Sequence, residues 1–281
     1  MSTRPDRARS ESHEILSPLP AVDGEKLLHD AIAEHEPSHI FALYSGGNDS
    51  AVACSFTKRA IGDLLDAAVF IDTGTALPGV REHVETTTAA RGLRLIVLEA
   101  GDAFFEMVAK HGVPGPGAHR YPYVNLKERQ VDRLIREHKT RWNDRIMLVS
   151  GVRRSESDRR MGTAEPTSRD GCTVWANPLI DWTNAEMRTY RERNGIEPSD
   201  AAALMHRSGE CNCGAFAAPG EREMLRDLYP DWFERVVVRA ERIARRHGKH
   251  DRWGERPPGA TPDDDATGPL CRCQTYLEIA A

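Results

Sequence analysis

Long apolar runs, a secretory leader and abundant cysteine are all missing from this chain of 281 residues. No apolar run approaches the roughly 20 residues that a helix needs to span a bilayer. Residues 1–20 are polar and lack the apolar stretch of a signal peptide. Six cysteines are too few for a disulfide scaffold in a chain of this length. We therefore predict a cytoplasmic protein in a reducing compartment, with no membrane partner.

A surplus of positive charge is also missing, because 43 Asp and Glu outnumber 38 Lys and Arg and leave a formal net charge of −5. This balance excludes a uniformly basic nucleic-acid coat but allows local basic faces. Residues 120–160 hold 12 Lys and Arg against 6 Asp and Glu, and residues 235–252 hold seven against two. The second stretch is either a solvated helix face or a contact for a nucleic-acid backbone.

Four short apolar runs predict buried strands, over residues 39–44, 67–71, 93–98 and 146–149. Amphipathic stretches of helical length separate the first three runs. This alternation predicts an α/β fold with a doubly wound, mainly parallel sheet. Ligands of such sheets bind at the carboxyl ends of the strands, so the residues that follow each run are the candidates for function.

The remaining patterns suggest how the chain is divided. Helices are predicted around residues 27–32, over 185–194 and over 220–247, and a loop rich in Pro, Gly and Asp over 254–269. The predicted parts are a flexible N-terminal segment at 1–20, an α/β nucleotide-binding domain at 21–200, and a helical, cysteine-containing C-terminal region at 201–281.

The turn after the first strand has the composition of an anion site. Its two glycines allow a tight turn and a close approach to a ligand, and its hydroxyls and backbone amides open a helix. The Gly-Lys-Ser/Thr ending of a Walker A loop is absent. An ordinary capped strand-to-helix turn is the alternative. The candidate phosphate-binding residues are Ser45, Gly46, Gly47, Asn48, Asp49 and Ser50.

Polar residues also follow the second strand, where Asp72, Thr73 and Gly74 form an Asp-Thr-Gly turn. Its position at a strand's carboxyl end favours a functional role, in which the Asp72 carboxylate would hold a ribose, a water on Mg²⁺ or the acceptor. A plain capping turn is the alternative.

Arginines follow the fourth strand and its Gly151. The guanidinium fork suits phosphate or sulfate oxygens, whereas a solvated basic loop is the alternative. Lys127 lies upstream in a stretch with two tyrosines, and Glu156 is a candidate for orienting one arginine. The candidate anion-binding arginines are Arg153, Arg154, Arg159 and Arg160.

Four of the cysteines form two Cys-x-Cys pairs, Cys211 with Cys213 and Cys271 with Cys273. Four thiolates suit an iron–sulfur cluster or Zn²⁺, and the one-residue spacing favours a cluster because zinc sites usually space the cysteines more widely. Ordinary buried or free thiols are the alternative. Cys172 is a further candidate ligand or sulfur carrier, and Cys54 is expected in the core.

Taken together, the motifs SGGNDS, IDTGTALPG, YPYVNLKE, SGVRRSESDRR and NPLIDWTNAEM resemble the phosphoadenosine phosphosulfate (PAPS) reductase family of the PP-loop ATP pyrophosphatase superfamily, also called adenine-nucleotide alpha-hydrolases. The resemblance implies a Rossmann-like sheet that binds an adenine nucleotide with residues 45–50, Asp72, Thr73, Gly74, Gly151 and Arg153. It implies catalytic roles for Asp49, Asp72, Arg153 and Arg154, and substrate binding by Lys127, Arg154, Arg159 and Arg160.

The sequence also departs from that family. It ends QTYLEIAA without the Glu-Cys-Gly-x-His tail of PAPS reductases, and it lacks the adjacent Cys-Cys pair of iron–sulfur adenylylsulfate reductases. The intact SGGNDS resembles members that cleave ATP between the α and β phosphates. We therefore predict ATP and Mg²⁺ as ligands and sulfur transfer to an acceptor such as tRNA or DNA, with sulfur supplied by a donor protein. A sulfonucleotide reductase that releases sulfite, and a non-catalytic nucleotide-binding zinc module, are the alternatives.

Overall fold

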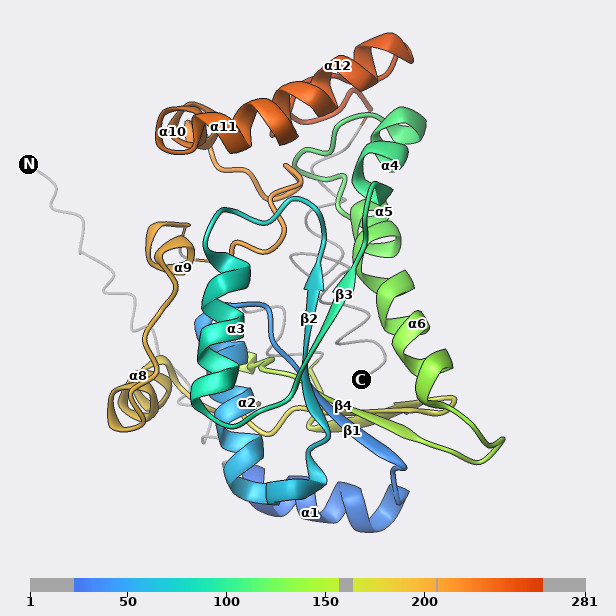
Figure 1. Ribbon diagram of the computed structural model, residues 1–281, viewed down its shortest axis with the longest axis vertical. Helices are drawn as coiled ribbons and strands as arrows, with labels where there is room; N and C mark the ends of the chain where they lie inside the picture. Colours follow the sequence, from blue (N-terminus) through green and yellow to red (C-terminus); the bar gives the residue numbers. More distant parts are fainter. Residues whose placement is uncertain (1–22, 157–163, 206, 260–281) are drawn as a thin grey trace, which may run out of the picture.

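A six-stranded sheet forms the centre of the molecule in a computed structural model that describes residues 23–156, 164–205 and 207–259 (Figure 1). Its strand order is β3-β2-β1-β4-β6-β5. All neighbouring pairs are parallel except β5 with β6. The strands are β1 His39–Leu43, β2 Ala67–Asp72, β3 Leu95–Glu99, β4 Ile146–Val149, β5 Thr167–Asp170 and β6 Thr173–Ala176.

The four apolar runs form the neighbouring parallel strands β1, β2, β3 and β4, so the predicted doubly wound α/β fold is confirmed. The β5–β6 hairpin was not predicted. β5 reads Thr-Ser-Arg-Asp and is largely exposed, while β6 has only four residues. Neither segment offers a long apolar run or an alternating pattern, and the hairpin pairs with β4 through β6 alone.

Alternating side chains of the strands belong to two separate hydrophobic cores, one on each face of the sheet. Ile40 and Ala42 of β1 pack with the helices α1 Gly24–His35, α2 Asn48–Ile61 and α3 Val80–Ala90. Phe41 between them faces the other side and packs with Val131 and Leu134 of α6 Arg129–His138. This period of two, with helices on both faces, is the doubly wound arrangement that was predicted.

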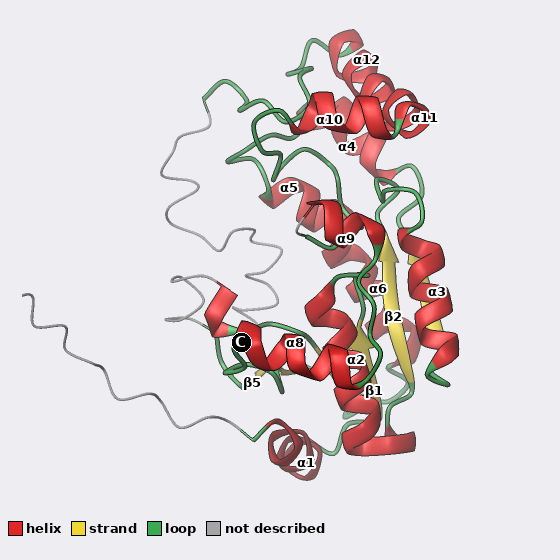
Figure 2. Ribbon diagram, turned by 90° about the vertical axis from the view of Figure 1, so that its left-hand side faces the viewer, coloured by secondary structure: helices red, strands yellow, loops and turns green. Residues whose placement is uncertain are grey.

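A layer of helices lies above the carboxyl ends of β2 and β3, toward which the arrowheads of these strands point in Figure 1. Figure 2 shows the same layer from the side, with α10, α11 and α12 beyond the end of the sheet. Among the helices of the described residues, none combines the length and the apolar character that crossing a membrane requires. The remaining helical segments are α4 Ala103–His111, α5 Arg120–Tyr123, the π-helical turn η2 Val124–Glu128, α8 Asn184–Arg193, α9 Asp200–Met205, α10 Glu221–Leu228, α11 Pro230–Phe233, η4 Glu234–Val238, α12 Arg239–Arg246, and the short 3₁₀ turns η1 Gly62–Leu64 and η3 Arg154–Glu156.

The prediction of a single helix over 220–247 is wrong. α10 ends at Leu228, and α11 begins at Pro230. Proline has no N–H to continue the helix, and it disfavours the α conformation at the residue before it. Tyr229 accordingly has φ −132° and ψ 59°. The helix that follows contains a π-helical turn at η4 and then continues as α12.

The turn that leads into β4 is organised by Asp144. Its carboxylate accepts hydrogen bonds from the backbone N–H of Arg141 at 2.7 Å and of Thr140 at 2.8 Å, and from the Ser38 hydroxyl at 3.1 Å. These bonds, the one from Arg141 foremost, lower the pKa of Asp144 to about 2.

Because the folded-state pKa lies below the unfolded value of about 3.9, Asp144 stabilises the fold above pH 4 and loses this effect as the pH falls toward 2. We expect Asp144→Asn to lower the melting temperature at pH 7, and the difference from the parent protein to shrink as the pH falls from 4 to 2. Thermal scans across that range test this. A difference that stays constant down to the lowest pH would contradict it.

Candidate nucleotide site and cysteine pocket

The turn after β1 folds into a compact loop, here called the phosphate loop, residues 45–50. The Ser50 hydroxyl donates to the Gly47 carbonyl at 2.9 Å and lies 3.0 Å from the Ser45 hydroxyl. Gly46 has φ 78°, a left-handed conformation that favours glycine. Asn48 begins α2, whose first-turn N–H groups are a natural anion site. The loop therefore has the local geometry of a phosphate cradle.

Two neighbouring segments approach this loop so closely that only glycine fits. A Cβ on Gly151, which follows β4, would lie 2.7 Å from the backbone carbon and oxygen of Asp49 and 2.9 Å from the Ser50 nitrogen. A Cβ on Gly47 would lie 2.8 Å from the Cβ of Ser208. Gly151 thus packs the carboxyl end of β4 against the phosphate loop.

Arg153 is buried, and it is bonded to the protein at every donor position. Its Nε and one terminal nitrogen donate to the Asp49 carboxylate at 3.2 and 2.9 Å. The remaining donors reach the Ser155 hydroxyl, the Trp182 carbonyl and the Asn184 side chain at 2.7 to 3.1 Å. A guanidinium has five N–H donors, and all are used. Arg153 therefore positions Asp49, and the predicted contact with a phosphate would require this network to open.

Arg154 is also paired within the protein. It donates to the Asp181 carboxylate and to the Ala164 carbonyl. The other two predicted anion-binding arginines, Arg159 and Arg160, lie outside the described residues. Of the two described arginines, Arg153 contacts the phosphate loop through Asp49, whereas Arg154 is paired with Asp181.

The β2 turn joins the nucleotide side of the sheet to the cysteines. Asp72 accepts a hydrogen bond from the Gly74 N–H at 3.0 Å and lies 3.4 Å from Arg81, and its side chain is 24% exposed. Thr73 is fully buried and donates to the Glu210 carbonyl at 2.6 Å. Thr75, which the sequence did not single out, accepts from the Asn212 N–H at 3.1 Å. The Asp-Thr-Gly turn is thereby the anchor of the segment that carries Cys211.

A largely buried ion pair borders the two described cysteines of that segment. The Lys127 ammonium lies 2.5 Å from the Glu210 carboxylate, and Glu210 also accepts from the Ser208 hydroxyl. Burial works to lower the pKa of Lys127, but the charges of Glu210 and of Cys211 outweigh it and raise the pKa above its ordinary value. Burial likewise works to raise the pKa of Glu210, and Lys127 reverses this shift. Sequence analysis picked out Lys127 and missed Glu210, its partner 83 residues away.

The thiols of Cys211 and Cys213 line one small cavity. Its other walls are His119, Pro122, Tyr123, Lys127, Ala215 and Phe216. The bond from Cys213 and the charge of Lys127 lower the pKa of Cys211, whereas the pKa of Cys213 is raised by the Cys211 thiol and by burial. We call this cavity and the eight residues that line it the cysteine pocket. Two soft donors that face one space fit half of a four-thiolate site.

The structure describes two of the four predicted thiolate ligands, Cys211 and Cys213. Cys271 and Cys273 lie outside the described residues. Within residues 23–156, 164–205 and 207–259, no three His, Cys, Asp or Glu side chains form a set of metal ligands. Cys172 lies between β5 and β6, and its carbonyl accepts from Ile146 at the start of β4. It is therefore at the amino end of the sheet, opposite the phosphate loop. Cys54 is buried in the core, as predicted.

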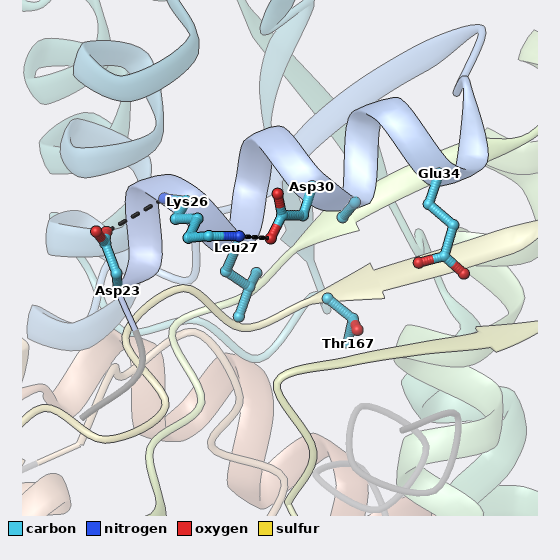
Figure 3. A pocket seen from close by; sticks show the side chains of 7 residues that line it. Asp23, Lys26, Leu27, Asp30, Glu34 and Thr167 are labelled. Atoms are coloured by element: carbon cyan, nitrogen blue, oxygen red, sulfur yellow. Dashed lines mark hydrogen bonds and ion pairs between the residues drawn. The ribbon is translucent and has the colours of Figure 1, made fainter. Parts of the chain in front are cut away.

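A separate shallow groove runs along α1, between this helix and β5 (Figure 3). It is lined by Asp23, Lys26, Leu27, Asp30, Ala31, Glu34 and Thr167, and Lys26 is paired with Asp30 at 2.5 Å. The groove shares no residue with the phosphate loop or the cysteine pocket.

The segments that make up the nucleotide site are covered by a known domain. The sequence profile of the phosphoadenosine phosphosulfate reductase domain matches residues 39–201, more than half of the chain. The chain belongs to this domain family. The resemblance predicted from the motifs is thus confirmed, and the PAPS reductase domain of this chain is a nucleotide-binding domain of the PP-loop type.

Two curated relatives illustrate the range of similar proteins. An uncharacterized protein of Methanocaldococcus jannaschii is 25% identical over 221 residues, which cover 76% of this chain and 44% of the relative. The glutamine-hydrolyzing GMP synthase of Corynebacterium ammoniagenes is 37% identical over 119 residues, 40% of this chain and 22% of the relative. The chain therefore spans less than half the length of either.

Among solved structures, a phosphoadenylyl-sulfate (PAPS) reductase from Candida auris in a phosphate complex aligns with 16% identity and a TM-score of 0.49. The alignment covers 66% of this chain and 85% of that one.

Proposed function

We propose that this PAPS reductase-family domain binds ATP, cleaves it between the α and β phosphates, and activates an acceptor for sulfur transfer. The observation that carries the proposal is the phosphate loop, in which serine hydroxyls and α2 amides gather at the carboxyl end of β1. Such donors stabilise the charge that builds up on a departing pyrophosphate. The intact SGGNDS, which resembles that of family members that cleave ATP between the α and β phosphates, supports ATP over a sulfonucleotide.

The proposed reaction has two displacements. An acceptor oxygen attacks the α phosphorus of ATP, and the bond to the β-phosphate oxygen breaks and releases pyrophosphate. A sulfur nucleophile, with hydrosulfide-level sulfur from a donor protein, then attacks the activated acceptor atom and displaces AMP, which leaves with the acceptor oxygen.

The chain's own residues have distinct tasks in this scheme. The phosphate loop holds the β and γ phosphates, and Arg153 keeps Asp49 in place under the loop. Asp72, with its partly exposed carboxylate at the end of β2, is the proposed contact for Mg²⁺ or the ribose. Lys127 and Glu210 fix the segment that carries Cys211 relative to the β2 turn.

For the cysteines we propose one site of four thiolates from Cys211, Cys213, Cys271 and Cys273, which would hold an iron–sulfur cluster. A bound cluster would supply electron transfer or an iron that binds sulfide. Zn²⁺ at the same thiolates is the alternative.

The reaction products distinguish the two catalytic candidates. We expect the protein with ATP, Mg²⁺ and an acceptor pool to release pyrophosphate and AMP. The family description favours a second candidate, the reduction of PAPS or adenylylsulfate with release of sulfite. Parallel assays with ATP, PAPS and adenylylsulfate, the last two with a thiol reductant, decide between them. Sulfite without pyrophosphate would replace the proposed function by the second candidate.

The cluster assignment makes a spectroscopic prediction. Protein purified without oxygen is expected to be brown and to contain iron and labile sulfide, and Cys211→Ser is expected to lose most of that colour. Cys54→Ser is the matched control, since Cys54 is buried against Leu43 in the core and should leave the iron content unchanged. Stoichiometric zinc without iron would overturn the cluster.

A further inference from the structure

The C-terminal ends of α4 and α12 meet at one corner of the helical layer and bring together cations from two distant parts of the chain. Figure 1 shows α12 lying across the top of the molecule above α4. Arg239 at the start of α12 sits 3.7 Å over the Phe105 ring of α4. At the other end, the Val113 N–H donates to the His250 carbonyl at 2.8 Å. The residues just before Val113 and His250 are therefore neighbours.

This corner, here called the basic corner, consists of Lys110, His111, Arg246 and Lys249. All four side chains are exposed, and within the described residues none of them has an acidic side chain in ion-pair contact. By contrast, the α12 arginines outside the corner are paired, such as Arg239 with Asp102 and Arg245 with Asp251.

The two lysines of the corner act on His111. The pKa of His111 lies below its ordinary value because of burial and then because of Lys110 and Lys249. A cation at the C-terminal end of a helix stabilises that helix by about 0.3–1 kcal/mol, because it offsets the helix dipole. This effect explains the cations at each helix end separately, but it does not explain why the cations of two helix ends lie together. In a chain with a net charge of −5, an uncompensated group of like charges is the mark of an anionic partner.

The basic corner is also connected to the cysteine pocket. The His111 ring stacks on the Tyr121 ring with 5.2 Å between centroids, and burial together with the nearby Cys213 thiol raises the pKa of Tyr121. Downstream of Lys249, the Trp253 indole donates to the Asn212 carbonyl, between the two cysteines, at 3.0 Å. An elongated polyanion bound at the basic corner would thus be separated from the cysteine pocket by the stacked rings of His111 and Tyr121.

We infer that the basic corner binds the phosphodiester backbone of a double-stranded nucleic acid and holds it beside the cysteine pocket. The inference deepens the proposed function, on which it rests, by naming the class of acceptor. Lysine and arginine side chains spaced over two helix ends suit successive phosphates, and contacts of this kind carry affinity without reading the base sequence.

The test compares two variants with the same change in net charge. One is Lys110→Gln with Arg246→Gln and Lys249→Gln. The control, Arg94→Gln with Arg188→Gln and Arg193→Gln, removes three exposed arginines away from the corner. Fluorescence anisotropy with labelled 20-base-pair RNA and DNA duplexes of one sequence, without ATP and at several salt concentrations, gives the affinities. Which duplex binds more tightly identifies the kind of acceptor.

We expect the corner variant to bind the preferred duplex at least tenfold more weakly at 100 mM salt, with a salt slope reduced by about 2–3 for three lost phosphate contacts. The control is expected to stay within about twofold of the parent protein. Equal losses in both variants, or no duplex binding by the parent, would overturn the inference. So would binding to vesicles of anionic lipid but not to either duplex. Because ATP is absent, a failure here is distinct from a failure to release pyrophosphate.

Discussion

Replacing Gly151 by alanine is expected to weaken ATP binding at least a hundredfold while the protein stays folded. The new methyl group would lie 2.7 Å from the Asp49 backbone and 2.9 Å from the Ser50 nitrogen. The contacts are with backbone atoms, so no side-chain rotation relieves them. The phosphate loop has to move, and donors aimed at a phosphate lose their alignment, which costs binding steeply. Calorimetric titration with ATP measures the effect, and circular dichroism checks the fold.

Gly92→Ala is the control for this prediction. Gly92 has φ 60° with open space around its Cβ position, and it lies in the turn before β3, away from the loop. Alanine there costs about 1 kcal/mol of stability through backbone strain and is expected to leave ATP affinity unchanged. If Gly151→Ala bound ATP as tightly as Gly92→Ala, the phosphate loop would not be the nucleotide site.

Lys127→Met is expected to destabilise the protein by about 3–5 kcal/mol, because it leaves the Glu210 carboxylate buried without its partner. Glu210 connects two parts of the site. Its carboxylate accepts a hydrogen bond from Ser208, which lies beside the phosphate loop, and its carbonyl accepts one from Thr73 of the β2 turn. Adding Glu210→Gln removes the buried charge and is expected to restore at least half of the loss. Urea denaturation of the parent protein, both single variants and the double variant yields the coupling free energy.

An exposed ion pair offers the comparison. Lys58 lies 2.9 Å from Asp63, whose side chain is fully exposed, so Lys58→Met is expected to change stability by less than about 1 kcal/mol. A cost for Lys127→Met no greater than that for Lys58→Met would contradict a structural role for the buried pair. A double variant no more stable than Lys127→Met would contradict it as well.

The fold was predictable where a strand is a short, continuous apolar run. Val69 and Phe70 of β2 point to opposite faces and both are buried, which is why the run is apolar throughout. The β5–β6 hairpin lies at the sheet edge, and Arg169 and Asp170 are exposed there, so apolar patterning did not reveal it. The break at Tyr229 could have been predicted from Pro230.

The candidate site was predictable where local sequence determines it and less so where distant segments meet. The glycines and serines of residues 45–50 make the turn and the hydroxyl contacts within the loop, which are local in sequence. The partner of Lys127 is 83 residues away, and the anchors Thr73 and Thr75 reach a segment 137 residues away. No spacing rule links such positions. Arg153 is a further example. Its positive charge predicted a contact with an anionic ligand, but in the fold it donates to Asp49 and Asn184, which are 104 and 31 residues away.

The division of the chain at residue 200, the catalytic assignments and the cytoplasmic location remain predictions. The central one is that the phosphate loop holds the pyrophosphate end of ATP. It is tested most directly by calorimetry of the parent protein with ATP, inorganic pyrophosphate and adenosine 3′,5′-bisphosphate in the presence of Mg²⁺. The account predicts that ATP and pyrophosphate bind and compete with each other, and that the bisphosphate does not displace pyrophosphate. Tight binding of the bisphosphate with no competition between ATP and pyrophosphate would contradict it.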